Sequence, residues 1–246
     1  MKFNYWQKFE DNCFYHIYNR GINKETIFKT DENMKFFLKR WKEMIGPYLD
    51  VAAFCLMPNH FHFLARVKTL TDEINAAIKK EGTVRAEKFG EGLIDYNDFL
   101  EDQFKRLFQS YALAFNKQQE RTGSLLQKRF KRVSVDNEYK LWHLLAYVHH
   151  NPIHHRFRSR YQDWGFSSYN TYLSVSPTLI IRDEVLAWFD PGYEAPRTPR
   201  LLNLQGLVNV QGGEHRKTAI QHFLKYHEEF KYNFKEMGDY YLDDED

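Results

Sequence analysis

The first third of the chain alternates between apolar segments with strand and helix periodicity. Residues 13–20 (CFYHIYNR) and 50–57 (DVAAFCLM) are short apolar runs, which are typical of buried strands. Residues 31–48 (DENMKFFLKRWKEMIGPY) open with acids and carry apolar residues at helical spacing, which predicts a helix ending at a Gly-Pro pair. A Pro-Asn turn then precedes another strand at residues 60–67 (HFHFLARV). This region therefore predicts strand, helix, strand, turn and strand.

The middle of the chain continues the pattern after an interruption. Residues 68–102 are polar and contain three glycines, which indicates an insertion with some helix. A long helix is predicted from residue 103 to Gly123, followed by a strand at residues 129–135. The last predicted helix of this core covers residues 136–152, with Asp136 as its N-cap and its end near a proline.

The order β-α-β-β-α-β, followed by a further helix, is that of a split βαβ fold. We therefore expect the α+β class: a ferredoxin-like antiparallel sheet with helices packed on one face. The core domain is expected at residues 1–175, with the insertion at about 68–102. Residues 176–246 read as a C-terminal extension that contains a Pro-rich stretch, a helix at 215–230 and an acidic tail.

Composition limits the classes of protein that fit. The chain has 246 residues, of which 43% are hydrophobic, enough for one sizeable domain with extensions or for two small ones. Its two cysteines, Cys13 and Cys55, have no CxxC spacing, which argues against a disulfide scaffold or a cysteine zinc site. We see no signal peptide and no apolar run of membrane-spanning length. A cytoplasmic protein with no membrane partner is expected.

The small net charge of +2 hides an uneven distribution. The last eight residues carry five acids and no base; without them, 35 basic and 28 acidic residues leave +7. Residues 121–135 contain five bases and no acid, and residues 154–160 add three arginines. Such clusters suit a phosphate backbone, although an ordinary solvated face has the same composition. The candidate DNA-binding residues are Arg121, Lys128, Arg129, Lys131, Arg132, Arg156 and Arg158.

Two histidines lie inside the apolar strand at residues 60–67. Because side chains alternate along a strand, His60 and His62 point to one side and Phe61 and Phe63 to the other. Two imidazoles on one face form either a polar patch at a sheet edge or a pair of metal ligands. The pair alone does not decide between the two.

The last core helix carries further polar groups. Tyr147 and Asn151 are four residues apart and so lie on the same helical face. If that face meets the histidine pair, two imidazoles and an amide oxygen could hold a divalent cation, and the phenol beside it would be a candidate nucleophile. A core tyrosine and a helix C-cap are the alternatives. His149, His150, His154 and His155 form either a surface patch or another ligand set.

Four motifs in order resemble the HUH single-tyrosine transposases, and most closely the REP-associated tyrosine transposases. They are FYHIYNRGINKETIF, MPNHFHFL, YVHHNPIHHRF and DWGFSSYNTYL. The last is similar to the Trp-Pro-x-Ser-Ser stretch of that family, with Gly165 in the proline position. The likeness covers about residues 12–175. The His-hydrophobic-His motif is not specific by itself, whereas the ordered set with YxxxNP is specific.

The resemblance implies a DNA enzyme. Such enzymes cut single-stranded DNA with a tyrosine hydroxyl, leave a 5′-phosphotyrosine and a free 3′-OH, and rejoin strands by the reverse reaction. Carried over by position, it implies Tyr147 as nucleophile, His60 and His62 as catalytic metal ligands, and Asn151 as third ligand for Mg²⁺ or Mn²⁺. The implied partner is single-stranded or hairpin DNA. Both a homodimer and a monomer remain open.

Two rival functions remain at this point. One is a protein that binds DNA hairpins but has lost the chemistry; the histidine and tyrosine set argues against it, because binding alone requires none of these residues. The other is a zinc hydrolase, which is disfavoured because the chain has no HExxH motif.

Overall fold

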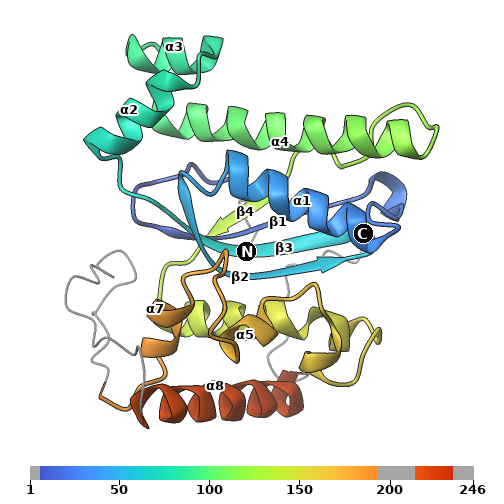
Figure 1. The fold of residues 1–246 in the computed structure, drawn as a ribbon, viewed down its shortest axis with the longest axis vertical. Helices are drawn as coiled ribbons and strands as arrows, with labels where there is room; N and C mark the ends of the chain where they lie inside the picture. Colours follow the sequence, from blue (N-terminus) through green and yellow to red (C-terminus); the bar gives the residue numbers. More distant parts are fainter. Residues whose placement is uncertain (1–5, 193–213, 235–246) are drawn as a thin grey trace.

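In the computed structural model, residues 6–192 and 214–234 are described, and they form an antiparallel sheet between helical layers (Figure 1). The sheet order is β2-β3-β1-β4, and each neighbouring pair is antiparallel. The strands are β1 (Phe14–Arg20), β2 (Leu49–Met57), β3 (His60–Val67) and β4 (Lys131–Ser134). Since β3 lies between β1 and β2, the split βαβ arrangement and the α+β class are confirmed.

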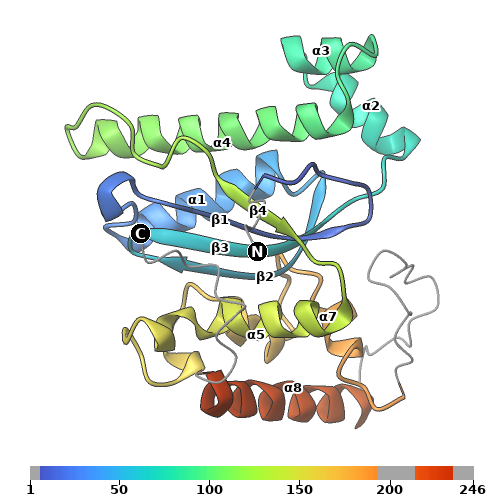
Figure 2. The same ribbon diagram turned by 180° about the vertical axis from the view of Figure 1, so that it is seen from behind.

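The helices lie on both faces of this sheet. Their bounds are α1 (Asp31–Met44), α2 (Asp72–Lys80), α3 (Val84–Gly90), α4 (Tyr96–Gln118), α5 (Glu138–His154), α6 (Tyr169–Tyr172), α7 (Arg182–Ala187) and α8 (Glu214–Asn233), with 3-10 turns at Ile22–Lys24 and Tyr161–Asp163. The helices of the split βαβ unit, α1 and α4, share one face as predicted. The opposite face is covered by α5, with α8 beyond it, so helices pack on both faces and not on one face as predicted (Figures 1 and 2).

The alternation of β3 explains why both faces are covered. Phe61 and Phe63 point toward α1, where the ring of Phe63 stacks on Trp41 with centroids 3.6 Å apart and an angle of 5°. His60 and His62 point the other way, toward α5. An antiparallel strand with aromatic residues on one side and histidines on the other needs a partner layer on each side, because all of its residues are buried.

Two helix boundaries differ from the sequence prediction. Helix α4 begins at Tyr96, where the side chain of Asp95 accepts a hydrogen bond from the backbone of Asp98 at 2.8 Å, so part of the predicted insertion belongs to this helix. Helix α5 is capped by Asn137 and not by Asp136, since the Asn137 side chain accepts from the backbone of Lys140 at 2.8 Å. It also continues two residues past Pro152, which is tolerated because only one backbone bond is lost in the last turn.

The motif DWGFSSYNTYL runs along the outer edge of β2. The backbone of Leu56 donates to Phe166 at 2.9 Å, and the Ser168 hydroxyl accepts from the backbone of Phe54 at 2.9 Å. The indole of Trp164 donates to the carbonyl of Leu56 at 2.9 Å. This segment therefore satisfies the edge of the sheet, and Gly165 has open space at the position of a side chain.

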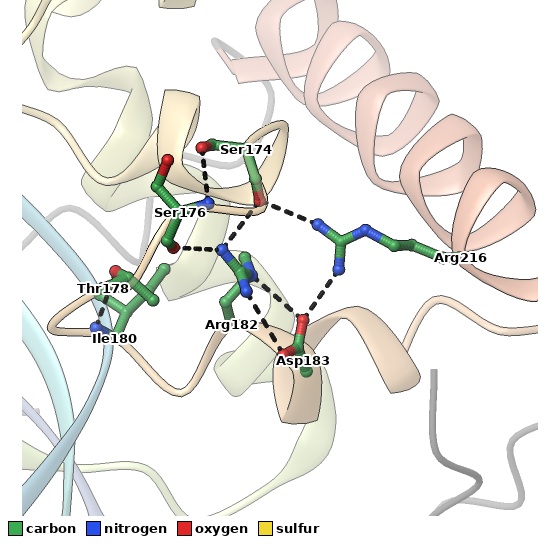
Figure 3. A network of polar contacts seen from close by, with 7 residues as sticks. All are labelled: Ser174, Ser176, Thr178, Ile180, Arg182, Asp183 and Arg216. Carbon is green, nitrogen blue, oxygen red and sulfur yellow. Dashed lines mark hydrogen bonds and ion pairs between the residues drawn. The ribbon is translucent and has the colours of Figure 1, made fainter. Parts of the chain in front are cut away.

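The described part of the C-terminal extension packs against the core. A polar network joins α7 to the start of α8 (Figure 3): Arg216 donates to Asp183 at 2.8 Å and to the carbonyl of Ser174 at 2.9 Å. Further along α8, Phe223 is fully buried. The division at residue 175 stays a prediction. Most of the Pro-rich stretch and the acidic tail lie outside the described residues. In the described ranges, no helix is long and apolar enough to cross a membrane.

Candidate functional site

The two histidines of β3 lie together under helix α5. The rings of His60 and His62 have centroids 5.1 Å apart and are nearly perpendicular, at 83°. Both are buried, with 8% and 1% of their surface exposed. The ring of His62 meets the ring of Tyr147 edge-on, with centroids 5.7 Å apart.

Asn151 reaches the same place from α5. Its side-chain oxygen lies 3.3 Å from Nε2 of His60, and its amide nitrogen donates to the backbone carbonyl of Tyr147 at 3.0 Å. The second bond directs the oxygen, and not the nitrogen, toward the histidine. Asn151 is thus an interior helix residue whose side chain faces the histidine pair, and the helix ends three residues later. The four residues predicted to form a site are neighbours in the structure.

The hydrogen bonds around His60 test whether a cation fits. Nδ1 of His60 lies 2.7 Å from Oδ1 of Asn59, whose amide nitrogen donates to the carbonyl of Lys24 at 3.4 Å. In the neutral ring Nδ1 therefore carries the proton, and Nε2 presents a lone pair to the Asn151 oxygen, which is also an acceptor. Two acceptors at 3.3 Å match adjacent ligands of an octahedral divalent cation, which are about 3 Å apart. These two groups fit such a cation.

The tyrosine is covered by the end of the C-terminal helix. Tyr147 is 1% exposed, and the ring of Phe234 lies nearly parallel to it at 11°, with centroids 6.5 Å apart. Phe234 also contacts the rings of His150 and His154, at 4.4 Å and 5.0 Å. Because Tyr147 is buried among Phe234, His16 and His62, a phosphodiester reaches its side chain only if some of these neighbours move.

The four histidines near the end of α5 divide into two pairs: His154 and His155 are exposed, with the His155 ring 4.9 Å from that of His60, whereas His149 and His150 are buried. His149 donates through Nδ1 to His227 at 2.8 Å, and His150 donates to the Tyr161 hydroxyl at 3.1 Å; both lie inside the interface with α8. Burial lowers the pKa of His150 to about 4 and holds that of His149 well below its usual value. Across the described ranges, no three His, Cys, Asp or Glu side chains are grouped to hold a metal ion. The predicted set of two histidines and an asparagine is of a different kind.

The basic residues of β4 divide between the two faces of the sheet. The Arg132 side chain is 4% exposed and donates to Glu101 and to the carbonyl of Gln7, and its guanidinium lies 4.5 Å from the Phe9 ring centre. Lys131 points to the face that carries the histidines, where its ammonium lies 5.6 Å from the ring centre of Tyr18. The Tyr18 ring in turn lies 5.6 Å from His62. Arg132 thus packs in the core, and Lys131 lies next to the site.

A groove of about 1040 Å³ runs between α4 and residues 123–130. Its lining includes the exposed bases Lys128 and Arg129 and the half-exposed indole of Trp6, over which the Arg129 guanidinium lies at 5.7 Å. Lys105 on α4 also lines it. The lining also contains Asp98, Glu101 and Asp102, but its six lysines and arginines outnumber these three acids. With the accessible ring of Trp6, such a groove suits a nucleic-acid strand, since phosphates can meet the basic side chains and a nucleobase can stack on the ring.

The remaining predicted DNA-binding residues differ in their surroundings. Arg121 is bound to Glu25 at 3.1 Å and to Asn116 at 2.7 Å, which neutralises its charge and ties it to the end of α4. Arg156 and Arg158 are exposed beyond the end of α5. The guanidinium of Arg158 lies 5.3 Å from the Trp164 ring centre.

Sequence reasoning missed two side chains at this site. His16 of β1 lies 2.9 Å from His62, and Asn59 lies against His60. The sequence did contain a signal for His16. Like His60 and His62, it is a histidine inside an apolar strand. The predicted split βαβ order places β1 beside β3, but it does not give the strand register that brings His16 to His62.

No protein-family model matches the chain. A curated protein of Haemophilus influenzae, assigned by its name to the REP-associated tyrosine transposases, is 26% identical over 137 residues, which cover 54% of this chain and 67% of that protein. The expected resemblance to this family is confirmed. A solved structure of a REP-associated tyrosine transposase bound to a REP hairpin has a TM-score of 0.49 and 13% identity, covering 72% of this chain and 89% of that one.

Proposed function

We propose that the chain is a divalent-metal-dependent enzyme that nicks and transfers single-stranded DNA at hairpins or repeats, with Tyr147 as the nucleophile. The observation that carries the proposal is that two motifs far apart in the chain come into contact. The ring of Tyr147 packs edge-on against that of His62, and the side-chain oxygen of Asn151 lies 3.3 Å from Nε2 of His60. The similarity to a REP-associated tyrosine transposase supports the same reaction class.

The proposed reaction exchanges one phosphodiester for another. The phenolic oxygen of Tyr147 forms a bond to phosphorus, the bond to the 3′ oxygen breaks, and the proton lost by the phenol is balanced by the one gained by the 3′-hydroxyl. A cation held by His60, His62 and Asn151 would supply charge to the non-bridging oxygens of the phosphate. Because bond energy is conserved, no nucleotide cofactor is required.

The DNA is proposed to cross the edge of the sheet at β4. Lys128 and Arg129 lie in the groove on one side of this edge, and Lys131 lies on the other side, next to Tyr18. The single-stranded flank of a hairpin, lying in the groove, would pass Lys131 on its way to the histidines. The buried Arg132 is the predicted DNA contact that the geometry favours least, because internal partners hold its guanidinium.

Tyr147→Phe tests the proposal, with Tyr139→Phe as its matched control. Tyr139 is on the same helix and is 56% exposed, so both variants remove one phenolic oxygen from α5. With a 3′-labelled hairpin and Mn²⁺, we expect the covalent adduct to vanish in Tyr147→Phe and to persist in Tyr139→Phe. Peptide mapping of the trapped adduct should find the phosphate on Tyr147. A normal adduct yield from Tyr147→Phe would overturn the assignment.

A hairpin-binding protein without chemistry is the second candidate, favoured by one observation: Phe234 and the surrounding core leave Tyr147 only 1% exposed. The same assay separates the two functions. Hairpin binding by the wild-type chain with no adduct at any Mn²⁺ concentration supports the binding protein.

A further inference from the structure

A third imidazole is joined to the candidate site. His16 on β1 is fully buried, and its Nε2 lies 2.9 Å from Nδ1 of His62. The two rings are nearly coplanar, at 12°, with centroids 5.1 Å apart, which is the separation expected for two rings linked edge to edge through that bond. Tyr18 packs beside His16 with centroids 4.8 Å apart, and Tyr147 meets it edge-on at 5.8 Å.

The bond between two neutral imidazoles has two forms. If Nδ1 of His62 donates to His16, its Nε2 carries a lone pair; if Nδ1 accepts, Nε2 carries the proton and cannot bind a cation. His60 shows the first form at the same site, because its Nδ1 faces the acceptor oxygen of Asn59. An acceptor at Nδ1 of each histidine would leave a lone pair on both Nε2 atoms.

We infer that His16 is a positioning residue of the metal site, accepting a hydrogen bond from Nδ1 of His62 and thereby holding the Nε2 lone pair of His62 ready for a divalent cation. The inference rests on the proposed function. Histidines that bind metals usually donate their other ring N–H to a protein acceptor, which fixes the tautomer and the ring direction. In this chain the acceptor comes from β1, the strand that pairs with β3.

The alternative is that the histidine pair only satisfies two buried polar groups in the core. His16→Phe separates the two roles, since it keeps an aromatic ring beside Tyr18 and removes the acceptor. His16→Gln is the conservative counterpart, because its carboxamide oxygen can accept from His62. Neither variant alters the groups proposed to touch DNA.

The first measurement is Mn²⁺ affinity without DNA, from the electron paramagnetic resonance signal of free Mn²⁺. We expect binding about 10–100-fold weaker in His16→Phe and within a few-fold of wild type in His16→Gln. Wild-type affinity in a folded His16→Phe would overturn the inference. His62→Ala is the reference: if it too binds Mn²⁺ normally, the proposed metal site fails and not merely the role of His16.

The second measurement uses the unaltered protein, in case His16→Phe does not fold. Nitrogen-15 correlation spectra of the Mg²⁺-bound chain report which ring nitrogen of His62 carries the proton. The inference expects the proton on Nδ1. A proton on Nε2 of His62 would exclude both the acceptor role of His16 and cation binding at that atom.

Discussion

The packing of α8 on α5 should be weakened by mild acid. His227 of α8 is fully buried, donates through Nδ1 to the carbonyl of Phe223 at 2.8 Å, and accepts through Nε2 from His149 at 2.8 Å. A proton on Nε2 would face the N–H of His149 and break this bond. Burial lowers the pKa of His227 to about 3, and burial likewise lowers that of His150, across the same interface, to about 4.

The sign and size of the effect follow from these values. The folded-state pKa lies below the unfolded value of about 6.5, so the unfolded chain binds the proton first as the pH falls. The contribution of these groups to the free energy of unfolding is therefore fully present above about pH 6.5 and is lost as the pH falls toward 4. Well below its unfolded pKa, each histidine should lower the free energy of unfolding by about 1.4 kcal/mol per pH unit. Because the slope is smaller near pH 6.5, the loss between pH 7 and pH 5 is about 2 kcal/mol. Two such groups remove about 4 kcal/mol, a large part of the 5–15 kcal/mol that folded domains have.

Urea unfolding at several pH values measures this slope, and His227→Gln isolates one group. Glutamine stays neutral and offers an oxygen to His149. Whatever its stability at pH 7.5, the variant should lose about 1.2 kcal/mol less than wild type between pH 6 and pH 5. Equal slopes for the two proteins would refute the reasoning, because they would mean that His227 takes up no extra proton on unfolding.

Further outcomes are expected from other parts of the structure. The double variant Lys128→Ala and Arg129→Ala should reduce the slope of log binding constant against log salt concentration by about 1.5, because two phosphate contacts are lost. The control double variant Lys217→Ala and Lys225→Ala, on the exposed side of α8, should leave this slope unchanged. Equal slopes for the two double variants would exclude the groove as the DNA-binding surface. Phe234→Ala should speed adduct formation, because it uncovers Tyr147; an unchanged rate would show that this ring does not limit access. Loss of the stacked indole in Trp41→Ala should cost about 3–5 kcal/mol of unfolding free energy in urea, and a cost below 1 kcal/mol would contradict the packing of the α1 face.

Much of the fold followed from local patterns. The strand at 60–67 and the helix that begins at Asp31 match their predicted positions, because apolar periodicity and turn residues act over a few neighbours. The start of α4 was placed too late. Its first turns are amphipathic, but the glycines before them suggested a longer irregular insertion. The fold class was predicted with helices on one face only, because an antiparallel sheet can have one face in water, and the packing of α5 on the second face entered only as a condition of the candidate site.

The candidate site likewise has features that the sequence predicted and features that only the packing decided. That His60 and His62 share a side follows from strand geometry, and that Tyr147 and Asn151 share a side follows from helix geometry. Their meeting was a hypothesis until the packing of α5 on the sheet brought His60 to 3.3 Å from Asn151. The resemblance to a transposase family pointed to the same residues, although their roles stay predictions.

The amino-acid sequence by itself determined the direction of each side chain relative to its own strand or helix, because that direction depends only on backbone periodicity. Only the tertiary structure decided which directions converge. It brought His16 of β1 within hydrogen-bond distance of His62. It buried Arg132 on one face of the sheet and placed Lys131 beside Tyr18 on the other. It also placed the ring of Phe234 nearly parallel to that of Tyr147. These outcomes depend on strand register and on contacts between residues far apart in the chain, where small differences in packing energy select one arrangement and no local pattern records the choice.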